Sequence, residues 1–240
     1  EYDHPFDERC AQFAAAGISF YVCPGTSSWN AVAGRTENAL GNLRAAAESG
    51  LRHGAIGYLN TDWGDNGHWQ YQPTAYLGYA YGAAVSWAVE ANADASDNGL
   101  DLIAALSLHA FDDPTGTMGQ LAYDLGNVYQ AWERETGQRI HNANFLVRVL
   151  YQPIEELEAR GFNWAEVSVE PFQAARQEIE VVIARLPQSQ MRGADAPLIR
   201  REYETAARLL LHACGLGELK VALARGEAVA ERAAALAEDM

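Results

Sequence analysis

The chain has 240 residues, of which 49 % are hydrophobic and 10 % aromatic, a composition that supports a substantial core and excludes a disordered protein. Its formal net charge of −15 argues against the basic surface with which proteins displace counterions from nucleic acid, and an anionic membrane surface would repel it. No apolar run reaches the roughly 18 residues of a membrane-spanning helix, so we expect neither nucleic acid nor a membrane as a partner.

The first part of the chain alternates between helical and strand-like stretches. A short helix is expected over 7–16, and apolar residues at helical spacing predict helices over 33–53 and 75–91; Gly17 and Gly54 end the first two. A compact β-rich run without strict alternation predicts a strand over 18–23 that is buried on both faces, and a short β-capable run predicts a second strand over 57–61. This order of elements is typical of β/α units with parallel strands.

Both predicted strands are followed by a loop that carries tryptophan. The loop at 24–30 holds Trp29 among glycine, serine and threonine, which suggests an exposed indole, and the loop at 62–70 combines acids, indoles and a histidine. Ligands of α/β proteins bind at the carboxyl ends of parallel strands. A sugar needs an apolar ring for its C–H face and carboxylates for its hydroxyls. The pattern therefore predicts a carbohydrate pocket, the alternative being a solvated loop whose tryptophans cap the core.

After residue 99 the sequence is helical throughout. The polar, glycine-bearing stretch at 92–99 predicts a boundary between an α/β domain at 1–92 and a helical domain at 99–240. The second domain should be a bundle, with helices over 100–112, 117–136, 141–160, 167–186, 196–214 and 217–238. Because two β/α units neither close a barrel nor cover a parallel sheet, residues 1–92 are expected to be the carboxyl-terminal part of a larger α/β domain.

The cysteines are few and widely spaced. Cys10, Cys23 and Cys214 fit neither a disulfide framework nor a zinc ribbon, so we expect buried, small apolar side chains. Unpaired cysteines favour a cytoplasmic location, although any export signal would precede Glu1.

A family resemblance is carried by three segments: DHPFDERC at 3–10, FYVCPGTSSWN at 20–30 and GYLNTDWGDNGHWQ at 57–70. Together they resemble the last strands of the catalytic barrel in glycoside hydrolase family 20, the β-N-acetylhexosaminidases. The resemblance implies an α/β fold, the C-terminal portion of a (β/α)8 TIM barrel followed by an all-helical domain. The seventh and eighth barrel strands would be 18–23 and 55–61.

The resemblance also implies an activity. Family members are exo-acting, retaining enzymes that remove terminal N-acetylglucosamine or N-acetylgalactosamine from β-linkages. In their substrate-assisted reaction the acetamido oxygen attacks the anomeric carbon, while an adjacent Asp-Glu pair orients that group and protonates the leaving oxygen. The pair belongs to the fourth strand, upstream of Glu1. We therefore expect this chain to bind the sugar, to need the N-terminal part of the same barrel, to lack hydrolysis alone, and to use no cofactor or metal.

Five residues are candidates for sugar binding. Trp63 and Asp65 match the family's Trp-x-acid pattern, which implies an apolar wall for the terminal sugar and an acceptor for its outer hydroxyls. Asp62 either orients the loop or touches substrate, and Trp29 would complete the aromatic wall. Tyr21 keeps the spacing of the family's acetamido donor, but a cysteine stands two positions later where the family has aspartate.

Two other classes of function stay open. The first is a non-catalytic carbohydrate- or partner-binding protein in which the pocket persists without turnover. The second is a helical interaction module for which the α/β part serves as scaffold. A strand ending in Asp-Glu upstream of Glu1 would favour the enzyme over the non-catalytic binding protein.

Overall fold

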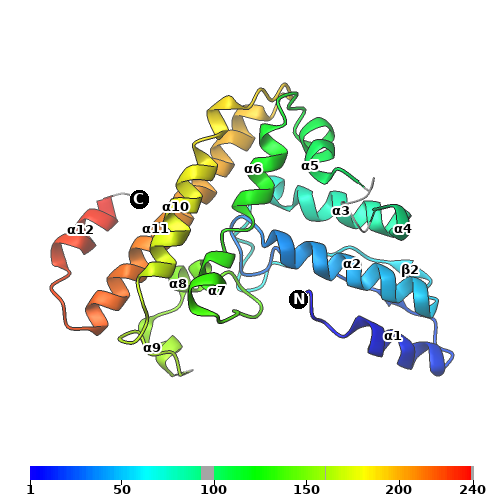
Figure 1. The fold of residues 1–240 in the computed structure, drawn as a ribbon, viewed down its shortest axis with the longest axis horizontal. Coiled ribbons are helices and arrows are strands. Elements are labelled where there is room, and N and C mark those ends of the chain that lie inside the picture. The colour runs from blue at the N-terminus through cyan, green and yellow to red at the C-terminus, as the bar shows by residue number, and fades with distance from the viewer. Residues whose placement is uncertain (93–99, 160, 239–240) are drawn as a thin grey trace.

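The computed structural model describes residues 1–92, 100–159 and 161–238, which form a mostly helical protein with one two-stranded parallel sheet. The sheet and the helices of the first ninety residues gather at one end of the molecule, and a long helical hairpin lies at the other (Figure 1). Most of the predicted boundary stretch, residues 93–99, lies outside the described residues. Among these residues, no helix has the length and apolar character needed to cross a bilayer.

The helices around the sheet follow the predicted pattern. They are α1 (Phe6–Ala15), α2 (Thr36–His53), the 3-10 turn η1 (Gln72–Ala75), α3 (Tyr76–Trp87) and α4 (Val89–Asn92). Gly54 ends α2 in a left-handed conformation, with φ of 73°, and its N–H closes the last turn onto the Gly50 and Leu51 carbonyls. The predicted helix over 75–91 is interrupted at Ala88, which has an extended backbone.

The two strands are parallel but shorter than predicted. Strand β1 (Tyr21–Val22) pairs with β2 (Gly57–Tyr58), Tyr21 lying opposite Gly57. Backbone hydrogen bonds continue on both sides, from the Ile56 N–H to the Phe20 carbonyl at 2.9 Å and from the Thr61 N–H to the Pro24 carbonyl at 2.9 Å. Pro24 has no N–H to donate, so the regular ladder stops there. The loops after the strands are nevertheless held side by side.

One face of the sheet is covered and the other is open. Val22 packs on Gly50 of α2, and the Tyr58 hydroxyl donates to the Leu43 carbonyl of the same helix at 3.1 Å. On the opposite face Tyr21 is 61 % exposed and Leu59 is 55 % exposed. The α/β part therefore has one helix-covered face and one apolar face open to solvent.

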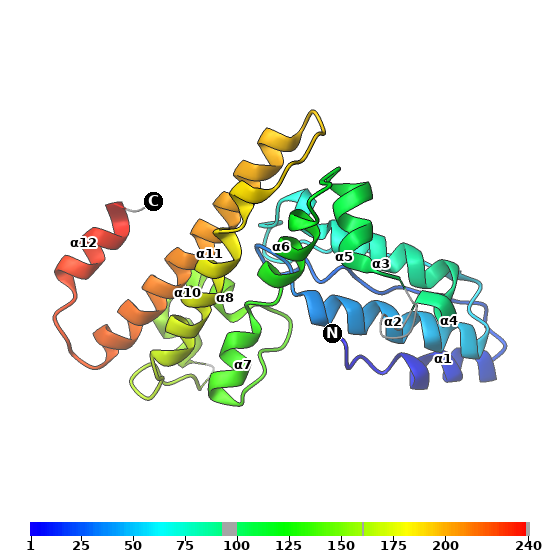
Figure 2. The same cartoon turned by 45° about the horizontal axis from the view of Figure 1, so that its top comes forward.

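Several of the remaining helices pack around the hairpin of α10 and α11, which run side by side in Figures 1 and 2. The remaining elements are α5 (Leu102–Ala105), the π-helical turn η2 (Leu106–Ala110), α6 (Thr117–Leu125), α7 (Gln130–Thr136), α8 (Phe145–Tyr151), α9 (Ile154–Glu158), α10 (Glu170–Ile183), the 3-10 turn η3 (Leu186–Gln188), α11 (Ala196–Ala224) and α12 (Ala230–Glu238). The predicted helices over 117–136 and 141–160 are each divided in two.

The predicted break between 214 and 217 is wrong. Helix α11 continues through this region, because Gly217 lies against the Phe172 ring of α10 and Gly215 faces Leu236 of α12. These glycines serve close packing between helices. The chain turns later, at Gly226, whose φ of 76° is left-handed.

The hydrophobic core runs across the predicted domain boundary. The Phe111 ring lies 5.8 Å from Tyr76 of α3 and 6.0 Å from Tyr203 of α11, measured between ring centroids. The buried Tyr203 hydroxyl donates to the Pro73 carbonyl at 3.2 Å. Helices on both sides of 93–99 therefore share one core.

Candidate functional site

A cavity of about 370 Å³ lies at the carboxyl ends of β1 and β2. Trp29 comes from the loop after β1, Trp63 and Asp65 come from the loop after β2, and all three line it. The size is that of a small-molecule pocket, roughly 300–1,000 Å³. Three of the five residues predicted from the sequence are thus brought together in one cavity.

The two indoles approach each other at Gly25. A Cβ atom there would lie 2.7 Å from Trp29 Cζ3 and 3.3 Å from Trp63 Cδ1, so only glycine leaves room for both rings. Trp63 is 55 % exposed and offers its ring to a ligand. Trp29 is only 8 % exposed, contrary to the prediction of an exposed indole, because its loop folds inward and the buried Arg35 guanidinium lies 5.0 Å from its ring centroid.

Asp65 is exposed at the rim of the cavity, in a tight turn. Asp65, Asn66 and Gly67 have φ values of 26°, 52° and 91°, so the backbone turns through successive left-handed residues. The Asn66 side-chain amide donates to Asn30 Oδ1 at 2.9 Å, which fixes this turn to the loop after β1. The Asp65 carboxylate makes no hydrogen bond within the described part of the chain. Its oxygens are available to accept from a ligand.

Asp62 lies behind this wall and binds protein groups. Its carboxylate accepts hydrogen bonds from the Thr26 and Ser28 hydroxyls, from His68 Nε2 at 3.0 Å and from the Tyr79 hydroxyl. Burial raises the pKa of Asp62, but the hydrogen bonds from Ser28, Thr26 and His68 outweigh burial and hold the pKa below its usual value. Of the two roles considered for Asp62, the geometry fits orientation of the loops.

Tyr21 does not line the cavity. Its ring lies over Gly57 on the open face of the sheet. Successive strand residues point to opposite faces, so Val22 faces α2 while Tyr21 and Cys23 share the open side. Cys23 is consequently exposed and lines the cavity, contrary to the predicted burial; Cys10 and Cys214 are buried as predicted.

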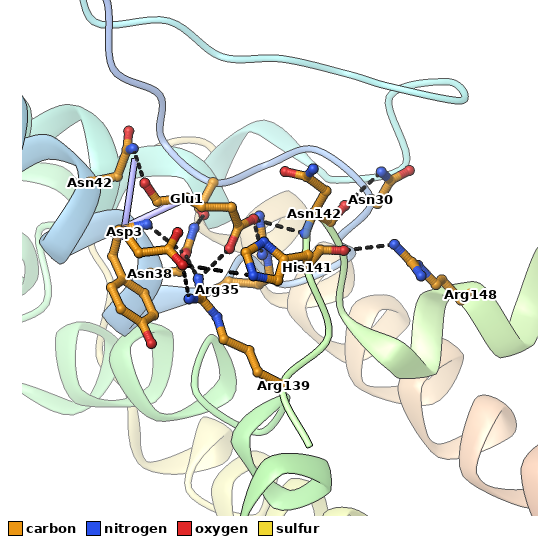
Figure 3. A network of polar contacts seen from close by, with 12 residues as sticks. Glu1, Asp3, Asn30, Arg35, Asn38, Asn42, Arg139, His141, Asn142 and Arg148 are labelled. Atoms are coloured by element: carbon orange, nitrogen blue, oxygen red, sulfur yellow. Dashed lines mark hydrogen bonds and ion pairs between the residues drawn. The ribbon is translucent and has the colours of Figure 1, made fainter. Parts of the chain in front are cut away.

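No sequence pattern indicated that Glu1 belongs to the site. Its carboxylate accepts from Arg35 Nη1 at 2.7 Å, from Arg139 Nη2 at 2.6 Å and from the Asn142 N–H at 3.0 Å (Figure 3). Burial raises the pKa of Glu1, but Arg35 and Arg139 attract its charge and the pKa is lowered. Glu1 is an ionised acceptor bonded to the protein and is unsuited to donate a proton.

Two asparagines also line the cavity without having been predicted. Asn42 Oδ1 accepts from the Gly25 N–H at 3.0 Å, and its amide nitrogen donates to the Glu1 carbonyl. The sequence could have indicated Asn42, because Asn38 and Asn42 lie one turn apart and place two amides on the buried side of α2. Asn142 belongs to the connection between α7 and α8, and no local pattern links that connection to the strand ends.

A larger cavity, of about 750 Å³, lies between α2, α5 and α6. Leu40, Tyr81 and Leu102 contribute to its walls, and the Tyr123 hydroxyl there is bonded to Glu37. This cavity is lined mostly by helices, and none of its lining residues belongs to the loops after β1 and β2. We therefore place the candidate site in the smaller cavity, where free polar groups and an exposed indole meet.

No protein-family model, curated protein or solved structure matches the chain. Chemically, the site offers an exposed indole beside a free carboxylate, which suits a polyhydroxylated ring with one apolar face. Its other acidic group, Glu1, is occupied by two arginines. The described residues also place no group of three or more His, Cys, Asp or Glu side chains where it would hold a metal ion.

Proposed function

We propose that this chain is the C-terminal portion of an exo-acting, retaining β-N-acetylhexosaminidase and that it supplies the sugar-binding wall of the active site. The observation that carries the proposal is the convergence of Trp29, Trp63 and Asp65 in one cavity at the carboxyl ends of two parallel strands. These residues lie in the segments that resemble glycoside hydrolase family 20.

The binding chemistry follows from the two side chains at the rim. The exposed Trp63 ring covers the C–H face of a pyranose, and Asp65 accepts hydrogen bonds from its outer hydroxyls. Gly25 and the Asp62 hydrogen bonds keep the two loops together. Trp29 forms the floor beneath them, and Arg35 supports its ring.

The open face of the sheet supports placing the strands in a larger barrel. Tyr21 and Leu59 leave apolar surface exposed on that face, and further parallel strands would cover it. In this proposal both side chains point into the barrel. Another β/α unit supplies the Asp-Glu pair, and the substrate's acetamido oxygen acts as the nucleophile.

One observation favours a second candidate, carbohydrate binding without hydrolysis. Of the two acidic side chains that line the cavity, Glu1 is held by two arginines, and only Asp65 is free. In this second candidate the chain binds sugar through Trp63 and Asp65, and no side chain of the cavity acts as a general acid. An assay for hydrolysis separates the two candidates.

Binding is tested on the 240-residue chain by ligand-observed NMR titration with N-acetylglucosamine. We expect Trp63→Ala to weaken the affinity at least tenfold, or about 1.4 kcal/mol. Trp87→Ala is the matched control, since Trp87 is 91 % exposed on α3 and outside the cavity. Equal affinity of wild type and Trp63→Ala would contradict the proposed site.

Hydrolysis is tested with a chromogenic N-acetyl-β-glucosaminide. We expect no turnover by the 240-residue chain and turnover by the polypeptide encoded by the extended reading frame. In that polypeptide Trp63→Ala should lower kcat/KM about tenfold or more, because it removes binding of the sugar. An extended polypeptide that binds the sugar without cleaving it would favour the non-catalytic candidate.

A further inference from the structure

We propose that Asn142, from the helical part of the chain, determines specificity in the sugar pocket: its side-chain amide hydrogen-bonds a hydroxyl on the rim of the bound sugar. The inference rests on the proposed function. It goes further by assigning a role in substrate recognition to the helical part, through the connection between α7 and α8.

The backbone of Asn142 is fixed at the cavity by two hydrogen bonds. Its N–H donates to Glu1 Oε1 at 3.0 Å, and its carbonyl accepts from the Asn30 side-chain amide at 2.8 Å (Figure 3). Asn30 in turn accepts from the Asn66 amide. Four segments that are distant in sequence therefore hold one another, and the position of Asn142 relative to the rim is fixed.

The side chain of Asn142, in contrast, is free. It lines the cavity and is exposed, and its amide makes no hydrogen bond to any residue that the structure describes. Its φ of 56° is a left-handed conformation that glycine adopts at the lowest cost. Asparagine tolerates this conformation better than most other residues, and glycine can replace it without backbone strain.

The other polar side chains of the cavity show why this amide matters. Glu1 and Asn42 are bonded to protein groups, the exposed His4 ring packs edge-on against Phe6, and Asp65 when ionised is only an acceptor. Asn142 adds an N–H donor to the rim. A sugar hydroxyl both donates and accepts, so a hydroxyl that donates to Asp65 has lone pairs left for Asn142.

The floor and the rim of the cavity differ in burial, which places this contact on the sugar. Trp29, Gly25 and Asn42 are buried and form the floor, whereas Asp65 and Asn142 are exposed at the rim. A bound pyranose presents its hydroxyls along its edge, where the rim side chains meet them. Asn142 therefore contacts a ring hydroxyl.

The test compares Asn142→Gly with wild type in the 240-residue chain. Glycine takes the left-handed conformation without strain and keeps both backbone hydrogen bonds, so this variant removes the amide alone. We expect the dissociation constant for N-acetylglucosamine to rise about five- to tenfold, the effect of one hydrogen bond. Asn163→Gly, at an exposed asparagine between α9 and α10 and outside the cavity, is the control and should leave the affinity unchanged.

A series of 3-, 4- and 6-deoxy analogues of N-acetylglucosamine identifies the contact. We expect wild type and Asn142→Gly to bind one of these analogues with equal affinity. That analogue lacks the hydroxyl to which the Asn142 amide hydrogen-bonds. A uniform loss of affinity over the whole series would show an indirect effect and overturn the inference. So would an unchanged affinity in Asn142→Gly while Trp63→Ala binds poorly, and that result would leave the proposed function intact. Failure of wild type to bind any of these sugars would overturn both.

Discussion

At the scale of single residues, Asp62 holds the two loops of the pocket together. The Thr26 and Ser28 hydroxyls reach it from the loop after β1, and His68 reaches it from its own loop at 3.0 Å. Gln70 also donates to Ser28, at 2.9 Å, so the two loops are joined at several points. Trp63 follows Asp62 directly in the chain, so the position of the exposed Trp63 depends on this group of hydrogen bonds.

We predict that Asp62→Asn lowers the free energy of unfolding by about 2 kcal/mol at pH 7, the effect of hydrogen bonds to a charged acceptor. In this variant the negative charge of the carboxylate is lost. The side-chain N–H group of the asparagine would also face the His68 N–H, so that two donors meet. Because the pKa of Asp62 is below its usual 3.8 in the folded protein, its contribution is present above pH 3.8 and disappears as the pH falls through the folded value.

Urea denaturation between pH 3 and pH 7 measures this difference. The difference in the free energy of unfolding between wild type and Asp62→Asn should be constant near neutrality and should become smaller below about pH 4. Glu48→Gln is the control, since Glu48 pairs with Arg44 on the surface of α2 and should contribute less than about 0.5 kcal/mol. A gap that did not depend on pH would contradict the role of the ionised carboxylate.

The candidate site was predictable from the sequence only in part. That Trp63, Asp65 and Trp29 lie together follows from parallel strands, whose carboxyl ends share one edge of the sheet. The burial of Trp29 was missed because it depends on Arg35, which a local pattern does not link to the indole. Asn142 was missed because its approach to the cavity depends on how the helices pack.

At the scale of elements, helix α11 shows where local pattern and packing disagree. Gly215 and Gly217 predict a helix end, since glycine interrupts helices and commonly follows them. In the structure the helix continues because both positions face another helix at short distance. The strands were located correctly but predicted too long, and at their carboxyl ends the regular ladder stops because Pro24 has no N–H to donate.

We predict that Gly217→Ala lowers the free energy of unfolding by about 2 kcal/mol. Alanine would favour a free helix by up to about 1 kcal/mol, but the new methyl group collides with the buried Phe172 ring, and overpacking costs roughly 1–3 kcal/mol or more. Gly215→Ala is the matched control. Its methyl group would meet only the end of the Leu236 side chain, at 2.7 Å, and α12 can adjust.

Urea denaturation of both variants provides the measurement. The free energy of unfolding of Gly215→Ala should stay within about 1 kcal/mol of the wild-type value, because the helix propensity of alanine partly offsets the crowding by its methyl group. Equal changes in the free energy of unfolding of the two variants would mean that both glycines act through helix propensity and not through packing against α10.

At the scale of the whole molecule, the α/β part and the helical part are joined on two sides. On one side Phe111 and Tyr203 pack on the elements around α3. On the other, Arg139 pairs with Glu1, and Trp69 stacks on Tyr151 of α8 with 6.4 Å between ring centroids. The composition change at 92–99 marks a change in secondary structure, and the core continues across it.

We predict that the chain unfolds as one cooperative unit, because neither part buries its core without the other. Hydrogen exchange with mass spectrometry across a urea series reports separately on peptides from 1–92 and from 100–238. Both sets should lose protection at the same urea concentration. The destabilising Gly217→Ala substitution lies far along α11 in the helical part, and it should lower the midpoint of the 1–92 peptides by the same amount as that of the 100–238 peptides. A shift confined to the helical peptides would instead show two independent domains, and the contacts of Phe111 and Arg139 would then be too weak to couple them.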